Sequence, residues 1–370
     1  MVSNFDFKVN NFDLIRIFAA FQVALYHGLE HFDLYAGFQA TPVFYNFMIF
    51  FPGVPIFFVV SGFLISASLE RSVSIKSYLI NRVVRIYPAL WGGLIIFLFT
   101  TFIFFDVNLT FAQFFLWFFA QLSILQFYWP EALKEVGATN GVLWTIPVEL
   151  QFYLTLPVLY YVFNKFKFSK LTLIFIFISF ILVNQTYVHY YENLDNAPIA
   201  LKLFGKTIFP YLYIFLLGVM IQRNMWFVKK YLAGNAHFFL MLYIVVELIT
   251  YQFELSVLGN FLNPLSVVFL SFLVISFAYS YTSSLTNINR GYDLSYGLYI
   301  YHMIFANVLL EIGLFDAVSN LFIMFLLSIC CALLSWRFIE RPAIKLKSTL
   351  NKKVNYSINS MELKKDNNNI

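Results

Sequence analysis

An arginine and a histidine lie eleven residues apart in the first long apolar segment of the chain, NFDLIRIFAAFQVALYHGLEHF. Ionisable side chains inside membrane-length segments cost roughly 2.5 kcal/mol or more to insert, so we first consider a functional role for them. Eleven helical steps of about 100° return to within about 20° of the starting direction, so Arg16 and His27 share one face of a helix. A rise of 1.5 Å per residue places them about 16 Å apart along the axis. We therefore expect two separate roles, with Arg16 near the cytoplasmic face and His27 in the outer half of the bilayer.

His27 is the candidate general base, because a neutral imidazole can take a proton near neutral pH. Its predicted partner is Glu149, which lies about seven residues, or roughly 10 Å, into a later apolar segment that enters from the same outer face. Glu30, one turn after His27, is a local alternative. The structural alternatives are a hydrogen-bonded packing histidine for His27 and an interhelical polar clamp for Glu149.

A pair of arginines opens the third apolar segment, NRVVRIYPALW. Arg82 and Arg85 are three residues apart, so they project on one side of a helix at the cytoplasmic boundary. Guanidinium groups match the oxygens of a phosphate, although the same pair also serves as a topology signal. Arg16 and Glu340, from the segment FIERP, are expected at a similar depth. The three arginines are thus predicted to converge on one anion-binding site at the inner face.

Two further motifs fall between these layers. The segment FFVVSGFLI places Ser61 and Gly62 in the inner half of the second span, where small residues allow helices to approach closely. The segment SYGLYIYHMIF places His302 in the inner half of a later span. We consider a role in a substrate tunnel and a structural hydrogen bond for His302 equally.

These residues need membrane helices to position them. The 370 residues are 61% hydrophobic and only 12% charged, which excludes an ordinary soluble domain. We predict an all-α integral membrane protein with about ten spans, near residues 13–32, 46–69, 84–106, 142–163, 170–188, 207–222, 236–252, 264–281, 294–312 and 317–338. Basic residues gather in alternate loops, which places both termini in the cytoplasm. Both termini lie on the same side only if the number of spans is even, so the apolar segment 111–128 is predicted to be interfacial or re-entrant and not a further span.

The chain divides into a transmembrane domain at 1–342 and a predicted disordered cytoplasmic tail at 343–370, rich in Lys, Asn and Ser. That tail and the basic loops account for the net charge of +5 and suit membrane lipids, so we expect no nucleic-acid partner. Cys330 and Cys331 are adjacent and match no metal-ligand spacing. We expect no metal and no permanently bound cofactor.

Six motifs in order resemble the acyltransferase-3 family of multi-pass membrane acyltransferases. They run from residue 12 to about residue 342 and comprise Arg16-x10-His27, FFVVSGFLI, RVVRIYP, WTIPVELQFYLTLP, LSYGLYIYH and FIERP. The fourth motif begins at Trp144, which we regard as a supporting residue together with Ser61, His302 and Glu340. One departure is Pro147, which stands two residues before Glu149 and is expected to shift that carboxylate by bending the helix.

The resemblance implies transfer of an acyl group, usually acetyl, from cytoplasmic acyl-coenzyme A to a hydroxyl of an extracytoplasmic glycan. It implies that His27 is catalytic and that Arg82 and Arg85 act on the donor, and the inner membrane of a bacterium as the location. Family members without an additional soluble domain, which this chain resembles, act on surface polysaccharides such as lipopolysaccharide O-antigen. Two alternatives remain: a transporter or flippase for a glycan or lipid-linked intermediate, in which His27 relays protons, and a purely structural partner of a polysaccharide assembly complex.

Overall fold

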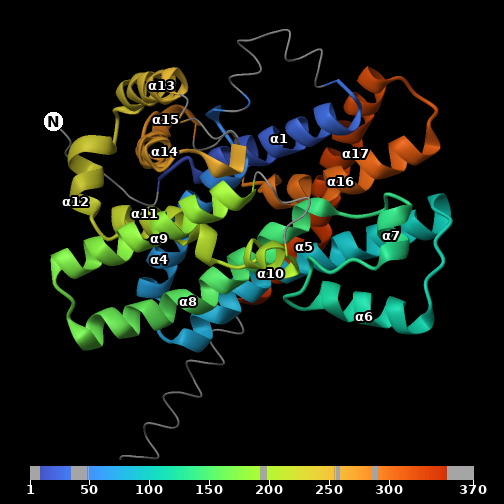
Figure 1. The fold of residues 1–370 in the computed structure, drawn as a ribbon, viewed down its shortest axis with the longest axis horizontal. Coiled ribbons are helices and arrows are strands. Elements are labelled where there is room, and N and C mark those ends of the chain that lie inside the picture. Colours follow the sequence, from blue (N-terminus) through green and yellow to red (C-terminus); the bar gives the residue numbers. More distant parts are fainter. Residues whose placement is uncertain are drawn as a thin grey trace, which may run out of the picture.

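Helices of very different lengths make up this protein, for which we analysed a computed structural model (Figure 1). The structure describes residues 9–34, 48, 50–191, 198–253, 255, 259–285 and 291–347, and no strand occurs within these ranges. The α-helices are α1 (Phe12–His31), α4 (Gly53–Arg71), α5 (Ile75–Phe104), α6 (Phe111–Leu122), α7 (Glu131–Glu135), α8 (Thr145–Phe166), α9 (Lys170–Tyr191), α10 (Ile199–Phe204), α11 (Leu212–Gln222), α12 (Met225–Phe227), α13 (Ala236–Gln252), α14 (Pro264–Ala278), α15 (Thr282–Leu285), α16 (Ser295–Ile312) and α17 (Ala317–Ser335).

Short turns of 3₁₀-helix and two π-helical stretches connect or extend these elements. The 3₁₀ turns are η1 (Gly141–Trp144), η3 (Phe209–Tyr211) and η5 (Gly259–Phe261), and the π-helical stretches are η4 (Val228–Leu232) and η6 (Trp336–Glu340). The stretch η6 prolongs α17, so that one helical segment runs from Ala317 to Lys347. The part of the predicted tail beyond residue 347 lies outside the described residues.

A helix occupies each of the ten predicted spans, but not all ten are long enough to cross a bilayer. Within the described part of the chain, six helical segments are long and apolar enough, and the bent pair Phe209–Gln222 and Met225–Leu232, at 73°, can provide a seventh. Helices α13 and α14 have only 17 and 15 residues, and α6 has 12, whereas a span needs about 20. The protein is therefore a multi-pass helical membrane protein, while the count of ten and the location of the termini stay predictions.

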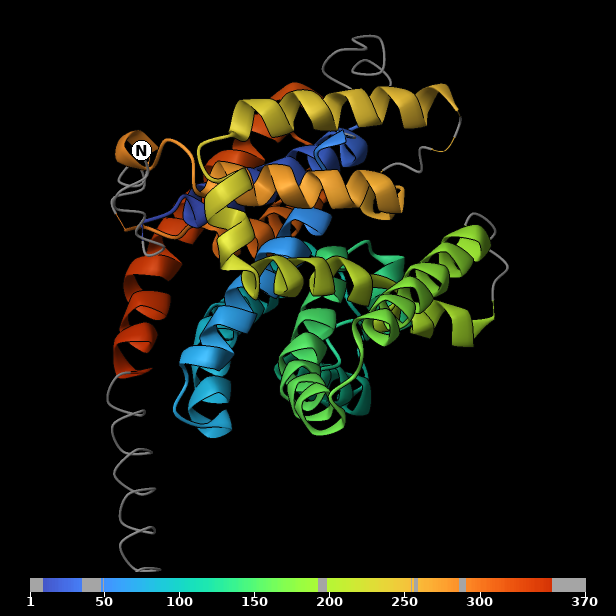
Figure 2. The same cartoon turned by 90° about the vertical axis from the view of Figure 1, so that its left-hand side faces the viewer.

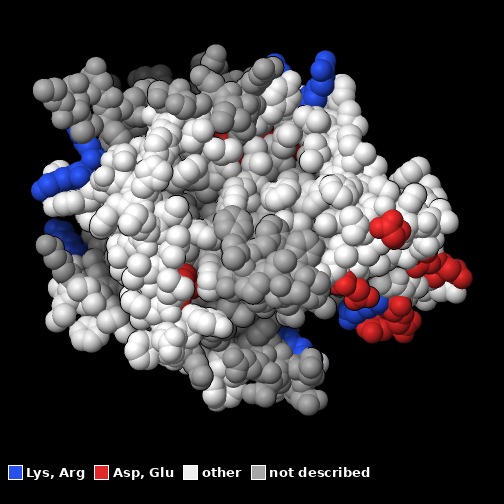
Figure 3. Space-filling model, turned by 90° about the horizontal axis from the view of Figure 1, so that it is seen from above, with Lys and Arg blue, Asp and Glu red and all other residues white. Residues whose placement is uncertain are grey.

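The surface agrees with this conclusion. Among the described residues in Figure 3, most of the surface is uncharged, and most of the acidic side chains gather at one end. Large apolar side chains such as Phe99, Phe102 and Phe322 are more than half exposed, as expected for a belt that faces lipid.

Helix α5 begins nine residues before the predicted start at residue 84. The Ser74 side chain caps it by accepting a hydrogen bond from the Ser77 backbone N–H at 3.1 Å. The predicted span began between Arg82 and Arg85, whereas the cap places both arginines inside the helix, in its second and third turns. The predicted start of this helix was therefore wrong by nine residues, while the location of the two arginines at the cytoplasmic boundary stays a prediction.

Helices α4 and α11 cross at their backbones. A Cβ atom added at Gly62 would lie 2.1 Å from the Phe215 carbonyl oxygen, and one added at Gly218 would lie 2.2 Å from the Val59 carbonyl oxygen. This contact confirms the prediction that the small residues after Ser61 permit close helix approach. It anchors the middle of α4, which lines the site described below.

Helix α1 packs along α16, and α17 covers the pair on one side (Figures 1 and 2). Gln22 on α1 also fixes the start of α4, because its side-chain oxygen accepts from the Gly53 backbone N–H at 2.7 Å. Its side-chain nitrogen donates to the Met48 carbonyl at 2.8 Å. Gln22, a polar residue inside a predicted span, thereby joins α1 to the start of α4, and both helices line the site.

The variant Gly62→Ala tests the crossing of α4 and α11. The added methyl group meets a backbone carbonyl that has no rotamer to change, so we expect a loss of about 2 kcal/mol in the free energy of unfolding. Thermal unfolding in detergent, followed by tryptophan fluorescence, measures the change. Gly141→Ala is the control, because a Cβ there has no neighbour within 4 Å. Equal melting temperatures for the two variants would contradict the contact.

Candidate active site

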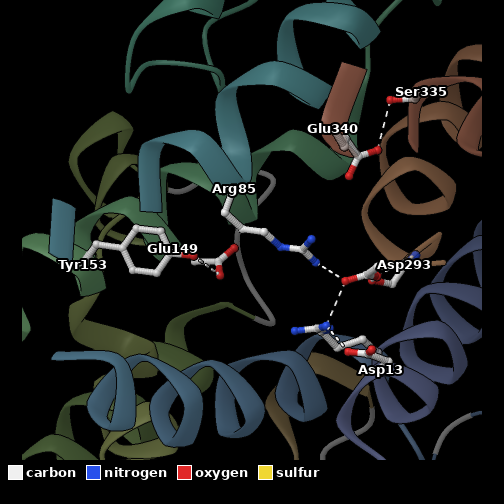
Figure 4. A network of polar contacts seen from close by, with 9 residues as sticks. Asp13, Arg85, Glu149, Tyr153, Asp293, Ser335 and Glu340 are labelled. Atoms are coloured by element: carbon white, nitrogen blue, oxygen red, sulfur yellow. Dashed lines mark hydrogen bonds and ion pairs between the residues drawn. The ribbon is translucent and has the colours of Figure 1, made fainter. Parts of the chain in front are cut away.

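A buried carboxylate joins three helices at the centre of the polar network in Figure 4. Asp293, which directly precedes α16, accepts a hydrogen bond from the Arg16 guanidinium of α1 at 2.8 Å through Oδ2. The same oxygen accepts one from the Arg85 guanidinium of α5. The convergence predicted for these two arginines is thus confirmed, and the acid that joins them was not predicted.

Asp293 is held as a carboxylate by its surroundings. Its other oxygen, Oδ1, accepts from the Ser295 hydroxyl at 2.6 Å and from the Ser295 backbone N–H at 3.3 Å, at the start of α16. Burial alone would raise the pKa of Asp293, but Arg16 and Arg85 outweigh burial and hold the pKa well below its usual range. The network therefore stays ionised throughout the physiological pH range.

A vestibule of about 550 Å³ lies beside this network and is lined by cations. It has five of them, Arg16, Arg71, Arg82, Arg85 and Lys347. Arg16 and Arg85 share Asp293, whereas the other three form no ion pair within 4.0 Å among the described residues. Arg82 donates to the Ser68 hydroxyl at 3.0 Å, which orients its guanidinium. The vestibule therefore has an excess of positive charge.

A deeper cavity of about 100 Å³ adjoins the vestibule, and the three arginines 16, 82 and 85 line both. Glu149 of α8 faces this cavity. Its Oε1 accepts from the Ser61 hydroxyl at 3.0 Å and from the Tyr153 hydroxyl at 2.6 Å. Tyr296 also lines this cavity, and its buried hydroxyl has no hydrogen-bond partner among the described residues.

Two histidines meet beyond the cavity. The Nδ1 atom of His27 lies 3.2 Å from Nε2 of His302, and the two rings stack at 5.4 Å. The Nδ1 atom of His302 lies 3.1 Å from the Leu298 carbonyl oxygen, which can only accept a hydrogen bond. His302 is fully buried, so its proton is held on Nδ1 and its Nε2 accepts from His27. This arrangement leaves Nε2 of His27 as the unprotonated nitrogen.

The predicted pairing of His27 with Glu149 is wrong. Glu149 bonds Ser61 and Tyr153 and faces the arginine-lined cavity instead. Equal depth did not bring the two residues together, because α16 with its His302 lies against α1 at the level of His27. The local alternative, Glu30, has an exposed side chain at the end of α1. Pro147 occupies the first turn of α8, where proline is tolerated, and α8 continues through it.

A single aromatic layer separates the cavity from the histidine pair. Tyr299 lines the cavity on one side, and its ring centroid lies 6.2 Å from that of His302 on the other. Its hydroxyl is 2.8 Å from the Thr145 hydroxyl and donates to the Val142 carbonyl at 3.2 Å. Phe57 packs edge-on against the same ring at 5.6 Å. Tyr299 therefore contacts both the cavity and the histidine pair.

The remaining predicted residues take other positions. Glu340 lies in the π-helical stretch η6, where its Oε1 accepts from the Ser335 hydroxyl at 3.0 Å. Its carboxyl group approaches Arg85 without pairing with it (Figure 4). Trp144 is not among the residues that line the cavity; its ring packs at a tilt against Tyr211, with centroids 5.3 Å apart, and the Lys206 ammonium lies 5.2 Å from its centroid. Within the described ranges, no group of His, Cys, Asp or Glu is arranged to hold a metal ion.

Comparison with known proteins identifies the family. The family model described as "Acyltransferase domain" matches residues 9–337. The chain belongs to the acyltransferase-3 family. Nodulation protein 10 of Rhizobium leguminosarum bv. viciae is 31% identical over 356 residues, 92% of this chain and 95% of that protein. A protein of Acidianus two-tailed virus that is named as an acetyltransferase is 26% identical over 335 residues, 87% of this chain and 90% of its own length. No solved structure matches the chain.

Membership makes this protein a membrane-bound O-acyltransferase rather than a transporter or a purely structural component. The cation-lined cavities and the histidine pair can then be interpreted in chemical terms. A transferase for acyl groups needs a place for the donor and a base for the acceptor hydroxyl. The cation-lined cavities and the histidine pair are the candidates for these two roles.

The variant Asp293→Asn tests the network. It leaves two buried guanidinium groups without their shared acid, so we expect a loss of about 3 kcal/mol in the free energy of unfolding, measured by denaturation in SDS. A lowered pKa contributes stability above the unfolded-state value of about 3.9, and this contribution is lost only as the pH falls through the folded-state pKa. The difference from wild type should therefore be constant between pH 8 and pH 5.

The matched control is Asp316→Asn at the exposed start of α17. Asp316 caps two backbone N–H groups, and asparagine caps a helix equally well. This variant should melt like the wild-type protein. A difference for Asp293→Asn that shrinks as the pH falls from 8 to 5 would contradict a carboxylate held ionised by arginines.

Proposed function

We propose that this protein transfers an acyl group, most simply acetyl, from acyl-coenzyme A bound on the cytoplasmic side to a hydroxyl of an extracytoplasmic glycan. The acceptors we propose are lipopolysaccharide O-antigen or another surface polysaccharide, and the location is the inner membrane of a bacterium. One observation is central to this proposal. Helices α1 and α16 hold an arginine–aspartate contact at one level and a histidine pair about eleven residues further along.

The donor half of the proposal rests on charge. Coenzyme A has three phosphate groups, and the vestibule has three cations, Arg71, Arg82 and Lys347, that no described acid neutralises within 4.0 Å. Guanidinium groups bind phosphate oxygens through paired hydrogen bonds. The buried Nε of Arg82 has no partner among the described residues, which leaves that donor available. The adenine nucleotide would bind in this vestibule, and the acylated arm would extend past Ser61 towards His302.

The catalytic half rests on the tautomer of His27. With its proton on Nδ1, bonded to His302, the Nε2 atom can accept the proton of an acceptor hydroxyl. The hydroxyl oxygen attacks the thioester carbonyl, the C–O bond forms and the C–S bond breaks. The proton then passes from His27 to the departing sulfur. The alternative is attack by His27 itself to give an acyl-histidine, which predicts ping-pong kinetics and a trappable acyl-enzyme.

The variant His27→Ala tests the base. General-base catalysis contributes roughly 100-fold or more, so we expect kcat for glycan acylation to fall at least 100-fold in purified protein reconstituted in nanodiscs. His302→Leu should lower kcat about tenfold, because it removes the acceptor for Nδ1–H. His302→Gln should recover part of the activity, since its amide oxygen can accept that hydrogen bond.

The control for the histidines is His189→Ala on α9, whose ring contacts only the neighbouring Tyr190 in the described contacts. It should retain wild-type activity. Full activity of His27→Ala, with insertion and melting temperature verified, would overturn the proposed mechanism.

The variant Arg82→Ala tests the donor site without disturbing the Asp293 network. Loss of a charged hydrogen-bond donor should weaken binding of coenzyme A about tenfold, and the difference should shrink at high salt. Isothermal titration in nanodiscs measures the affinity. The matched control is Arg223→Ala, since Arg223 stacks on Tyr160 and pairs with Glu70 outside the vestibule. Unchanged affinity for Arg82→Ala would remove this residue from the site.

A further inference from the structure

Glu149 is the unexpected group in the deep cavity. A carboxylate repels phosphate, and this one lies in a space that three arginines otherwise make attractive to anions. The hydrogen bonds from the Ser61 and Tyr153 hydroxyls both end on Oε1. Neither reaches Oε2, which can therefore accept a further hydrogen bond. A ligand group that enters here must be uncharged or positive, and it must present a hydrogen-bond donor.

Tyr296 supplies the complementary group. Tyr296 lines the same cavity, and its buried hydroxyl has no hydrogen-bond partner among the described residues. An unmet buried hydroxyl is costly, so a ligand that accepts its hydrogen bond would gain affinity. Besides its three arginines, the cavity therefore offers a carboxylate acceptor, Glu149, and an uncharged donor, Tyr296, between apolar walls that include Val54, Phe58 and Ile146.

We infer that Glu149 and Tyr296 bind the amide groups of the pantetheine arm of the donor, with Glu149 accepting from an N–H and Tyr296 donating to a carbonyl. This inference rests on the proposed function, in which the donor is acyl-coenzyme A. The pantetheine arm is neutral and has two amides separated by short aliphatic segments. Its polar and apolar groups match those of the cavity, whereas the phosphates match the vestibule.

The assignment gives Glu149 a binding role on the donor side in place of the predicted role beside His27. It also orients the donor. The carboxylate keeps phosphates in the vestibule, and the arm then points towards Tyr299 and the histidine pair behind it. A short anionic donor such as an acyl phosphate lacks the amides and would meet repulsion from the carboxylate.

The test measures binding of two ligands in nanodiscs by isothermal titration. Coenzyme A contains the arm, and adenosine 3′-phosphate 5′-diphosphate has the same nucleotide and phosphates without it. Wild-type protein should bind coenzyme A at least tenfold more tightly. Glu149→Gln places an amide N–H against the N–H of the ligand, so the affinity for coenzyme A should fall about tenfold. The affinity for the nucleotide should not change.

Tyr296→Phe removes a hydroxyl that has no protein partner, so it should fold normally and lower the affinity for coenzyme A about threefold. If Glu149→Gln does not fold, Tyr296→Phe still tests whether the cavity binds the pantetheine arm. The control, Glu311→Gln, changes an exposed carboxylate at the far end of α16 and should alter neither affinity.

The outcomes separate this inference from the proposed function. Equal wild-type affinity for the two ligands, wild-type coenzyme A affinity in both variants, or an equal loss for both ligands would overturn the pantetheine site and leave the donor proposal standing. Failure of wild-type protein to bind either ligand would overturn the donor proposal itself.

Discussion

The contact of Asp293 with Arg16 and Arg85 is the interaction on which the rest of the site depends. It joins α1, α5 and the start of α16 through one carboxylate whose side chain is only 7% exposed. Breaking a buried ion pair costs far more than forming it gains, so this contact specifies the arrangement of the helices more than it adds stability. Because α1 and α16 run in the same direction from it, His27 and His302 meet about eleven and nine residues later.

The helical fold was largely predictable, since apolar runs of membrane length identify helices through composition alone. The boundaries of the helices were less predictable. The Ser74 cap starts α5 nine residues before the predicted start at residue 84, so that Arg82 also lies inside the helix. Helices α13 and α14, which occupy two predicted spans, have only 17 and 15 residues and pack against each other. Local hydrogen bonds and tertiary contacts decide these features.

The site was predictable in its components and not in its pairings. Periodicity gave the shared face of Arg16 and His27, and the arginines do line one space. Depth along the bilayer, however, says nothing about lateral position, so it matched His27 with Glu149 when His302 was the neighbour. Asp293 had a usable signal, because it is an acidic residue directly before an apolar segment that the arginines were also expected to flank. Tyr296 had none, since tyrosines are common throughout the chain.

The groups along the path change in character in the order that a thioester donor would meet them. Five cations come first, of which three form no ion pair within 4.0 Å among the described residues, then a carboxylate with hydroxyl groups, then the Tyr299 ring, and finally two imidazoles, of which His302 accepts a hydrogen bond from His27. Arg16 and His27 stand at the two ends of this order on one helix, about 16 Å apart along its axis. Under the proposed function, this separation would let α1 present one end to the phosphates of the donor and the other end to the acceptor hydroxyl.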